Sequence, residues 1–63
     1  MNNDPPPGTR VMFLREIRKA RRYDVGTLIA PMRKYLTERA DDEFIVRFEG
    51  EETIVHRQDI EQI

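Results

Sequence analysis

The feature that most constrains the fold of this sequence is a pair of alternating apolar segments on either side of Gly50. Residues 43–48 (EFIVRF) and 53–56 (TIVH) are separated by a short acidic segment that contains the glycine. A period of two is typical of half-buried β-strands, and glycine suits a hairpin turn because it adopts positive φ freely. With residues 50–51 as the loop, we expect Phe48 to lie opposite Thr53 and Val46 opposite Val55. The side chains expected on the buried face are Phe44, Val46, Phe48, Thr53 and Val55.

The length of the chain limits what can be built around this hairpin. Its 63 residues suffice for one small domain, with too little chain beyond the core to wall a deep catalytic cleft. The absence of cysteine excludes disulfides and thiolate metal sites, and a single histidine cannot form a multi-histidine zinc site. We therefore expect a binding or accessory domain, not an enzyme, with no cofactor, no metal and no small-molecule substrate.

The chain has no apolar run near the roughly 20 residues of a membrane span and no signal-peptide pattern. We expect a cytoplasmic protein, with peripheral association with a membrane complex left open. Residues 1–8, which include three consecutive prolines, are expected to form a flexible, disordered Pro-rich tail ahead of a domain over residues 9–63.

Further strands are expected over residues 10–17, 25–30 and 61–63, with a tight turn of 3₁₀ type at 57–60. Pro31 ends the second strand, and Gly26 within it indicates a bulge or a close backbone approach. The longer connection over residues 32–42 is left open between a loop and a short helical turn. Four or five short strands predict an all-β fold, a small closed barrel of about five antiparallel strands. The expected core residues are Val11, Phe13, Val25, Leu28, Phe44, Val46, Phe48, Val55, Ile60 and Ile63.

Four segments carry a resemblance to a known family. Residues 8–15 (GTRVMFLR), 22–27 (RYDVGT), 44–48 (FIVRF) and 57–63 (RQDIEQI) resemble the SH3-like barrel of the electron-transport accessory group, nearest to photosystem I reaction-centre subunit IV, the E subunit. The resemblance implies an SH3-like barrel and a basic surface that assists ferredoxin docking. That role is carried over to Arg15 and Arg22, where the local patterns match. Similar strand and turn motifs occur in ribosomal and Tudor-like SH3 barrels.

The net charge of −1 conceals a division along the chain. Residues 10–39 contain nine basic and three acidic residues, a balance of +6, whereas residues 40–63 contain two basic and eight acidic residues, a balance of −6. If the fold keeps the two parts separate, the domain has a positive side that orients charged partners during encounter. The alternative is that the two parts fold together and neutralise each other as weak surface pairs.

The basic residues concentrate in two loops, each with a tyrosine. The candidate partner-binding residues are Arg15, Arg18, Lys19, Arg21, Arg22, Tyr23, Arg33, Lys34 and Tyr35, and the second loop is expected to extend the patch formed by the first. Two functions remain open: docking of an acidic protein, in an electron-transfer complex, or nucleic-acid binding with the tyrosines stacking on bases. Tyr23 and Tyr35 are alternatively expected to cap the ends of the barrel.

Some apolar side chains are expected on the outer face. Met12, Ile45 and Ile54 fall at outward positions of their strands and could form a stripe that binds a partner, or be scattered exposed residues. His56 lies on the same face and is expected to be an ordinary exposed side chain. The acidic run at residues 41–43 lacks the alternating ligands and glycine of a calcium loop, so we expect a solvated loop.

Overall fold

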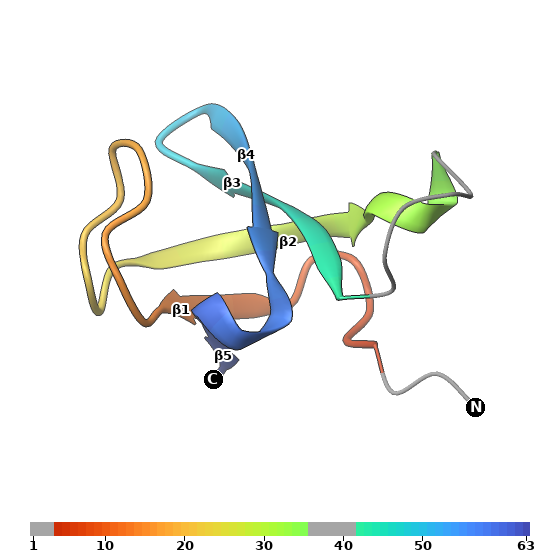
Figure 1. Cartoon of the computed structure of the whole chain (residues 1–63), viewed down its shortest axis with the longest axis horizontal. Helices are drawn as coiled ribbons and strands as arrows, with labels where there is room; N and C mark the ends of the chain where they lie inside the picture. The colour runs from red at the N-terminus through yellow and green to blue at the C-terminus, as the bar shows by residue number, and fades with distance from the viewer. Residues whose placement is uncertain (1–3, 36–41) are drawn as a thin grey trace.

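A computed structural model describes residues 4–35 and 42–63, and in this part of the chain the protein is all-β with no α-helix. The elements in chain order are β1 (Arg10–Phe13), β2 (Val25–Pro31), the 3₁₀ turn η1 (Met32–Lys34), β3 (Glu43–Phe48), β4 (Glu51–His56), the 3₁₀ turn η2 (Arg57–Asp59) and β5 (Ile60–Gln62). Figure 1 shows β2 along the length of the molecule, with the connection from β1 at one end and η1 at the other.

The strands form one antiparallel sheet in the order β4-β3-β2-β1-β5. Strands β1, β2 and β3 each pair with the next strand along the chain, and η2 then returns the chain so that β5 pairs with β1. This confirms the expected all-β fold of five antiparallel strands, although the strands form an open, curled sheet where the sequence predicted a closed barrel. Its curvature brings the inner face of every strand toward one small core.

The hairpin between β3 and β4 has the expected faces but not the expected register. Phe48 lies opposite Glu51 and Val46 opposite Thr53, a shift of two residues from the predicted pairing. The loop residues are Glu49 and Gly50, whose φ values of +51° and +79° suit a type I′ turn. A shift of two preserves side-chain alternation, so the prediction of which side chains share the inner face holds.

Strand β1 is shorter than predicted, because the chain leaves the sheet after Phe13. The Phe13 N–H donates to the carbonyl of Asp24 at 2.8 Å, and its carbonyl accepts from the Tyr23 N–H at 2.7 Å. These bonds close a loop over residues 14–24, which we call the basic loop. The other boundaries differ from the predictions by one or two residues: β2 includes Pro31, β4 begins at Glu51, and β5 begins at Ile60.

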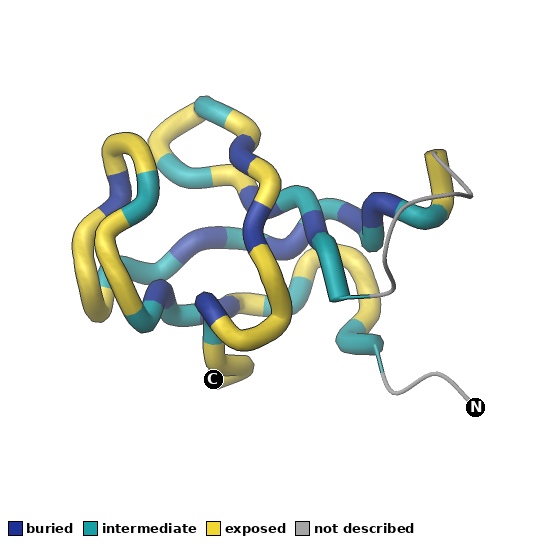
Figure 2. Tube along the Cα trace, viewed as in Figure 1, coloured by how far each residue is buried: buried dark blue, intermediate teal, exposed yellow. Residues whose placement is uncertain are grey.

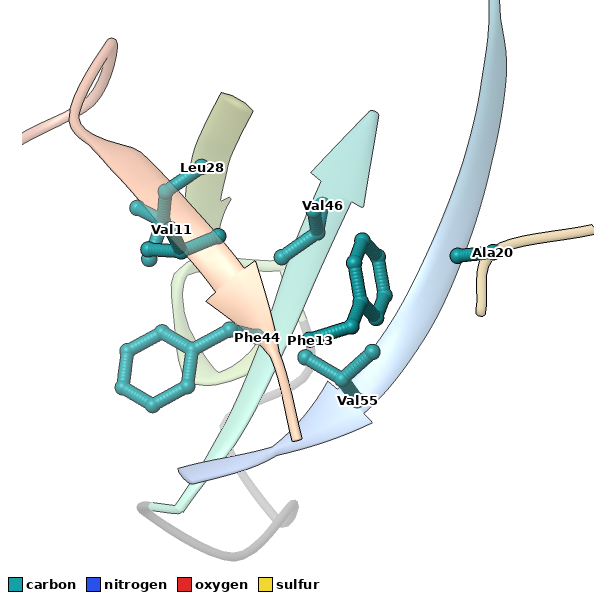
Figure 3. Close-up of a cluster of buried hydrophobic side chains, with 7 residues drawn as sticks. All are labelled: Val11, Phe13, Ala20, Leu28, Phe44, Val46 and Val55. Atoms are coloured by element: carbon teal, nitrogen blue, oxygen red, sulfur yellow. The ribbon is translucent and has the colours of Figure 1, made fainter. Parts of the chain in front are cut away.

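The core is formed by side chains from β1, β2, β3, β4 and the basic loop, which gather in one cluster (Figure 3). Six of the predicted residues are fully buried there: Val11, Phe13, Leu28, Phe44, Val46 and Val55. Three more of the predicted residues, Val25, Phe48 and Ile60, are half-buried. The ring of Phe48 meets that of Phe13 edge-on, with centroids 5.9 Å apart.

One core prediction is wrong. Ile63 is 65% exposed, because it follows the last residue of β5 and only its backbone bonds back to β1. Ala20, Ala30 and Met32 are buried instead. Figure 2 shows the buried residue of the basic loop between exposed neighbours, and Ala20 is the buried residue of that segment.

Gly26 is a site of close backbone approach, as the sequence predicted. A Cβ atom there would lie 2.8 Å from both the backbone oxygen of Arg47 and Cγ1 of Val46. The bulge lies elsewhere in the strand, where the register of β2 against β3 shifts between Leu28 and Ala30. The tight contact at Gly26 holds β2 against β3 at the end from which the basic loop emerges.

Candidate functional site

The basic loop projects from one end of the sheet as two successive turns (Figure 1, orange to yellow). In the first, Ile17 and Ala20 exchange two backbone hydrogen bonds of 2.9 Å around Arg18 and Lys19. Arg18 occupies the left-handed region at φ +53°. Ala20 packs in the core cluster and Ile17 lies against it, so the two turn residues are presented to solvent by a fixed backbone.

The second turn holds Tyr23 in an unusual backbone conformation. The Asp24 N–H donates to the carbonyl of Arg21 at 2.9 Å, and the Arg21 N–H donates to Oδ2 of Asp24 at 2.9 Å. Tyr23 has φ +79°, a region that costs a non-glycine residue about 1–2 kcal/mol. The hydrogen bonds of the turn and the bond from Tyr23 to Phe13 maintain that conformation.

The aromatic ring of Tyr23 is presented to solvent together with a cation. Tyr23 is 60% exposed, and the guanidinium carbon of Arg22 lies 4.9 Å from its ring centroid. This exposure is incompatible with the interpretation of Tyr23 as a cap over the end of the barrel. The pair combines a flat apolar surface with a positive charge at the base of the basic loop.

The positive charges of the basic loop are only partly neutralised. The Arg15 guanidinium contacts Asp59 at 2.9 Å, and Arg18 lies 3.6 Å from Glu51. At these positions the structure shows the second of the two alternatives, mutual neutralisation, because the hairpin and η2 bring acidic residues beside the loop. The cations of the loop that have no ion pair within the described residues are Lys19, Arg21 and Arg22.

Asp59 fixes the base of the basic loop. Its side chain is buried, and it accepts hydrogen bonds from Arg15 and from the His56 N–H at 3.1 Å. Burial alone would raise the pKa of Asp59, but the bonds and charges of Arg15 and His56 outweigh it and hold the pKa below 3.8. Arg15 thus has a charge partner within the domain, which distinguishes it from the unpaired cations.

The second group of candidate residues lies at the opposite end of β2 (Figure 1). Arg33 and Lys34 are in η1, and Tyr35 follows it. Seven strand residues separate the two groups, which corresponds to roughly 20 Å. The prediction that these residues extend the patch of the basic loop is therefore wrong. Tyr35 is 60% exposed and does not cap the barrel.

Arg33 has a partner that the sequence analysis missed. It forms an ion pair with Asp4, which also accepts a hydrogen bond from Arg57 at 2.7 Å. No local pattern indicates this cluster, because its members are far apart in the sequence. Lys34, by contrast, is exposed and has no ion pair within the described residues.

The outward apolar residues do not form one stripe. Ile45 pairs directly with Ile54, whereas Met12 pairs with Val25 and Glu61. The cross-strand row of Arg10, Thr27, Arg47 and Glu52 lies between them. Ile54 is exposed and the other two are half-buried, so the outer apolar surface consists of small separate parts.

His56 lies on the exposed face near two carboxylates. Its ring nitrogens are 3.5 Å from Asp42 and 3.8 Å from Glu43. Within residues 4–35 and 42–63 there is no group of three or more histidine, cysteine or acidic side chains placed to hold a metal ion. Asp41, part of the acidic run, is outside the described residues. Over the same residues, no helix has the length and apolar character needed to cross a membrane.

Comparison with family models, curated proteins and solved structures finds no match to this chain. Its candidate function therefore depends on the fold and on the surfaces described above.

Proposed function

We propose that the chain is a non-catalytic accessory domain that docks an acidic protein partner through the basic loop, in an electron-transfer complex of the ferredoxin-docking type. The observation that carries the proposal is the cluster of unpaired cations Lys19, Arg21 and Arg22 on one structured loop. Uncompensated charges on a protruding surface attract an oppositely charged partner and orient it during encounter.

The fixed backbone of the basic loop supports this function. Its two turns are closed by hydrogen bonds, and Ala20 anchors it in the core. Little conformational freedom is therefore lost when a partner binds, which lowers the entropic cost of docking. The β3–β4 hairpin, whose Glu51 contacts Arg18, is acidic and would repel an acidic partner. The partner is therefore expected to approach the basic loop from the side away from this hairpin.

The test is the association rate with a plant-type [2Fe–2S] ferredoxin as the acidic probe. Charge reversal by Lys19→Glu with Arg21→Glu is expected to slow association by about tenfold at low salt, and added salt is expected to reduce the difference. A single reversal, Lys19→Glu, is also measured. Its matched control is Lys34→Glu, which makes the same charge change at the far end of β2. Equal effects of Lys19→Glu and Lys34→Glu would contradict docking through the basic loop.

A second candidate function is supported by the exposed Arg22–Tyr23 pair. An aromatic ring beside a cation provides base stacking and phosphate contact, the combination found in proteins that bind single-stranded nucleic acid. The overall composition argues against it, since the chain has a pI near 5.8. Gel-shift titration with a single-stranded oligonucleotide at about 50 mM salt separates the two functions, because phosphate contacts are strong under those conditions.

A further inference from the structure

A carboxylate is held between two arginines at the end of the molecule away from the basic loop. Oδ1 of Asp4 accepts from Nη2 of Arg57 at 2.7 Å, and Oδ2 is in contact with Nη2 of Arg33. The three residues come from the N-terminal segment, η1 and η2. The Asp4 side chain is only 10% exposed, and each of its carboxylate oxygens faces one guanidinium group.

Both arginines are positioned by the fold. The Arg57 guanidinium lies over the ring of Phe44, 5.0 Å from its centroid, and its backbone N–H donates to the carbonyl of Asp42 at 2.6 Å. Arg33 lies in η1, which follows β2 directly, and its side chain is three-quarters buried. Two arginines held in this way form a preorganised site for a carboxylate, because guanidinium groups match its geometry.

Asp4 does not satisfy the whole site. Nη1 of Arg33 and Oδ2 of Asp4 are both buried and have no hydrogen-bond partner within the described residues, although Oδ2 is ion-paired with Nη2 of Arg33. Among the described residues, Arg33 and Arg57 are both ion-paired with Asp4, so two guanidinium groups share one carboxylate. A buried unpaired donor is unfavourable, so the arginines could accommodate a further acceptor oxygen.

Apart from its contacts with the two arginines, Asp4 has no hydrogen bond or ion pair within the described residues. Residues 5–7 are prolines, which have no N–H to donate, and the first N–H of this segment that bonds to the sheet is that of Gly8, to Leu28 at 2.7 Å. Pro6 and Pro7 are exposed. The carboxylate can therefore leave the arginines without breaking a hydrogen bond of the sheet.

We infer that Arg33 and Arg57 form a binding site for an acidic peptide segment of a partner protein, and that Asp4 is an internal occupant which such a segment displaces. The two arginines would bind a side-chain carboxylate of this peptide. The rest of the peptide would lie over the exposed surface of η1 and η2. This site is separate from the basic loop, and the inference does not depend on the docking role proposed for that loop.

Asp4, as the internal occupant, competes with an external peptide for the two arginines. A carboxylate tethered by a short segment acts at an effective concentration of the order of millimolar, so an external peptide must compete with it. Removing the charge of Asp4 is therefore expected to increase the apparent affinity for the peptide by about tenfold or more. Removing both guanidinium groups is expected to abolish binding.

The test uses the full-length chain with Asp4→Asn, and a synthetic peptide of its own residues 1–8 (MNNDPPPG) as the probe. Binding is followed by NMR through the Nε–H signals of Arg33 and Arg57. We expect saturable shifts of these signals in Asp4→Asn, at least tenfold weaker binding to the unmodified chain, and none in Arg33→Gln with Arg57→Gln. The control variant Asp4→Asn with Lys19→Gln changes a cation at the far end and is expected to bind the peptide normally.

Three results would overturn the inference. The first is an Asp4→Asn variant that loses thermal stability and shows no peptide-dependent shift at either arginine, which would make Asp4 a structural lock. The second is equal peptide affinity with and without the Asp4 charge. The third is tighter binding of inorganic phosphate than of the peptide at the same signals, which would make the site one for phosphate.

Discussion

The guanidinium of Arg15 donates to both carboxylate oxygens of Asp59, from Nε to Oδ1 at 2.9 Å and from Nη2 to Oδ2 at 3.4 Å. The pair joins the start of the basic loop to η2, two segments that are 44 residues apart. A backbone bond of 2.8 Å from the Leu14 N–H to the Asp59 carbonyl reinforces the same junction. The orientation of the basic loop is thus determined by the turn that leads into the last strand.

Removing the Asp59 carboxylate is expected to destabilise the domain. Asp59→Ala eliminates the acceptor for the His56 N–H and leaves Arg15 without its partner. We expect the free energy of unfolding to fall by about 1–3 kcal/mol, measured by urea denaturation. Glu61→Ala, on the exposed side of β5, is the control and is expected to stay within about 0.5 kcal/mol of the unmodified chain. Equal losses for the two variants would contradict the role assigned to Asp59.

The same pair predicts a loss of stability in acid. The pKa values of Asp59 and Asp4 are both below 3.8, because bonds and charges from arginines outweigh the opposing effect of burial. As the pH falls through 3.8, the ordinary value of an aspartate, the unfolded chain takes up protons before the folded chain does. The contribution to stability is therefore complete above that range and is lost as the pH falls through the lowered pKa values.

Urea denaturation between pH 7 and about pH 2 measures this loss. The double variant Asp4→Asn with Asp59→Asn carries neither carboxylate, so its stability is expected to depend less on pH over the acidic part of the range. A variant that loses stability in acid as steeply as the unmodified chain would show that other groups cause the loss.

How far the sequence predicts this fold is illustrated by the β3–β4 hairpin. The alternation of Phe44 and Val46 is local, so it identified the inner face correctly. The register was wrong because Gly50 can occupy either loop position, and the choice depends on Glu49 adopting a positive φ, which a sequence pattern does not indicate. Similarly, the end of β1 at Phe13 depends on hydrogen bonds to the far side of the basic loop.

For the candidate site too, local features were predicted correctly and long-range contacts were missed. The sequence located the cations of the basic loop, since their clustering is local. It placed Arg33 in the same patch, although the strand predicted between the two groups already separates them. The contacts of Asp4 with Arg57 and of Arg15 with Asp59 join residues 53 and 44 positions apart, and only the folded sheet brings them together.

The close approach at Gly26 makes that position intolerant of any side chain. In Gly26→Ala the new Cβ would lie 2.8 Å from the Arg47 backbone oxygen, and the paired strand cannot move away without disturbing the core. We expect a loss of about 1–3 kcal/mol in the free energy of unfolding. Gly50→Ala is the comparison: it has open space but φ +79°, so about 1 kcal/mol is expected. A loss at Gly26 no larger than that at Gly50 would show that the strands separate easily.

The side chain of Tyr23 is expected to contribute to binding and not to the stability of the fold. Its φ of +79° is unfavourable for tyrosine but is tolerated by asparagine, and its side chain is 60% exposed. Tyr23→Asn is therefore expected to leave the free energy of unfolding unchanged or raise it by up to about 1 kcal/mol in urea denaturation. Tyr23→Val, a β-branched residue in the same conformation, is expected to lower it. A clear loss of stability in Tyr23→Asn would mean that the ring supports the fold.

The same variant separates the two candidate functions of the basic loop. Tyr23→Asn removes the stacking surface but leaves Lys19, Arg21 and Arg22 in place, so docking of an acidic protein through these charges is expected to be nearly unchanged. Binding of single-stranded nucleic acid is expected to weaken by about tenfold, since stacking on one aromatic ring contributes roughly 1–3 kcal/mol. Weakened ferredoxin association in Tyr23→Asn at constant charge would contradict docking governed by electrostatic attraction.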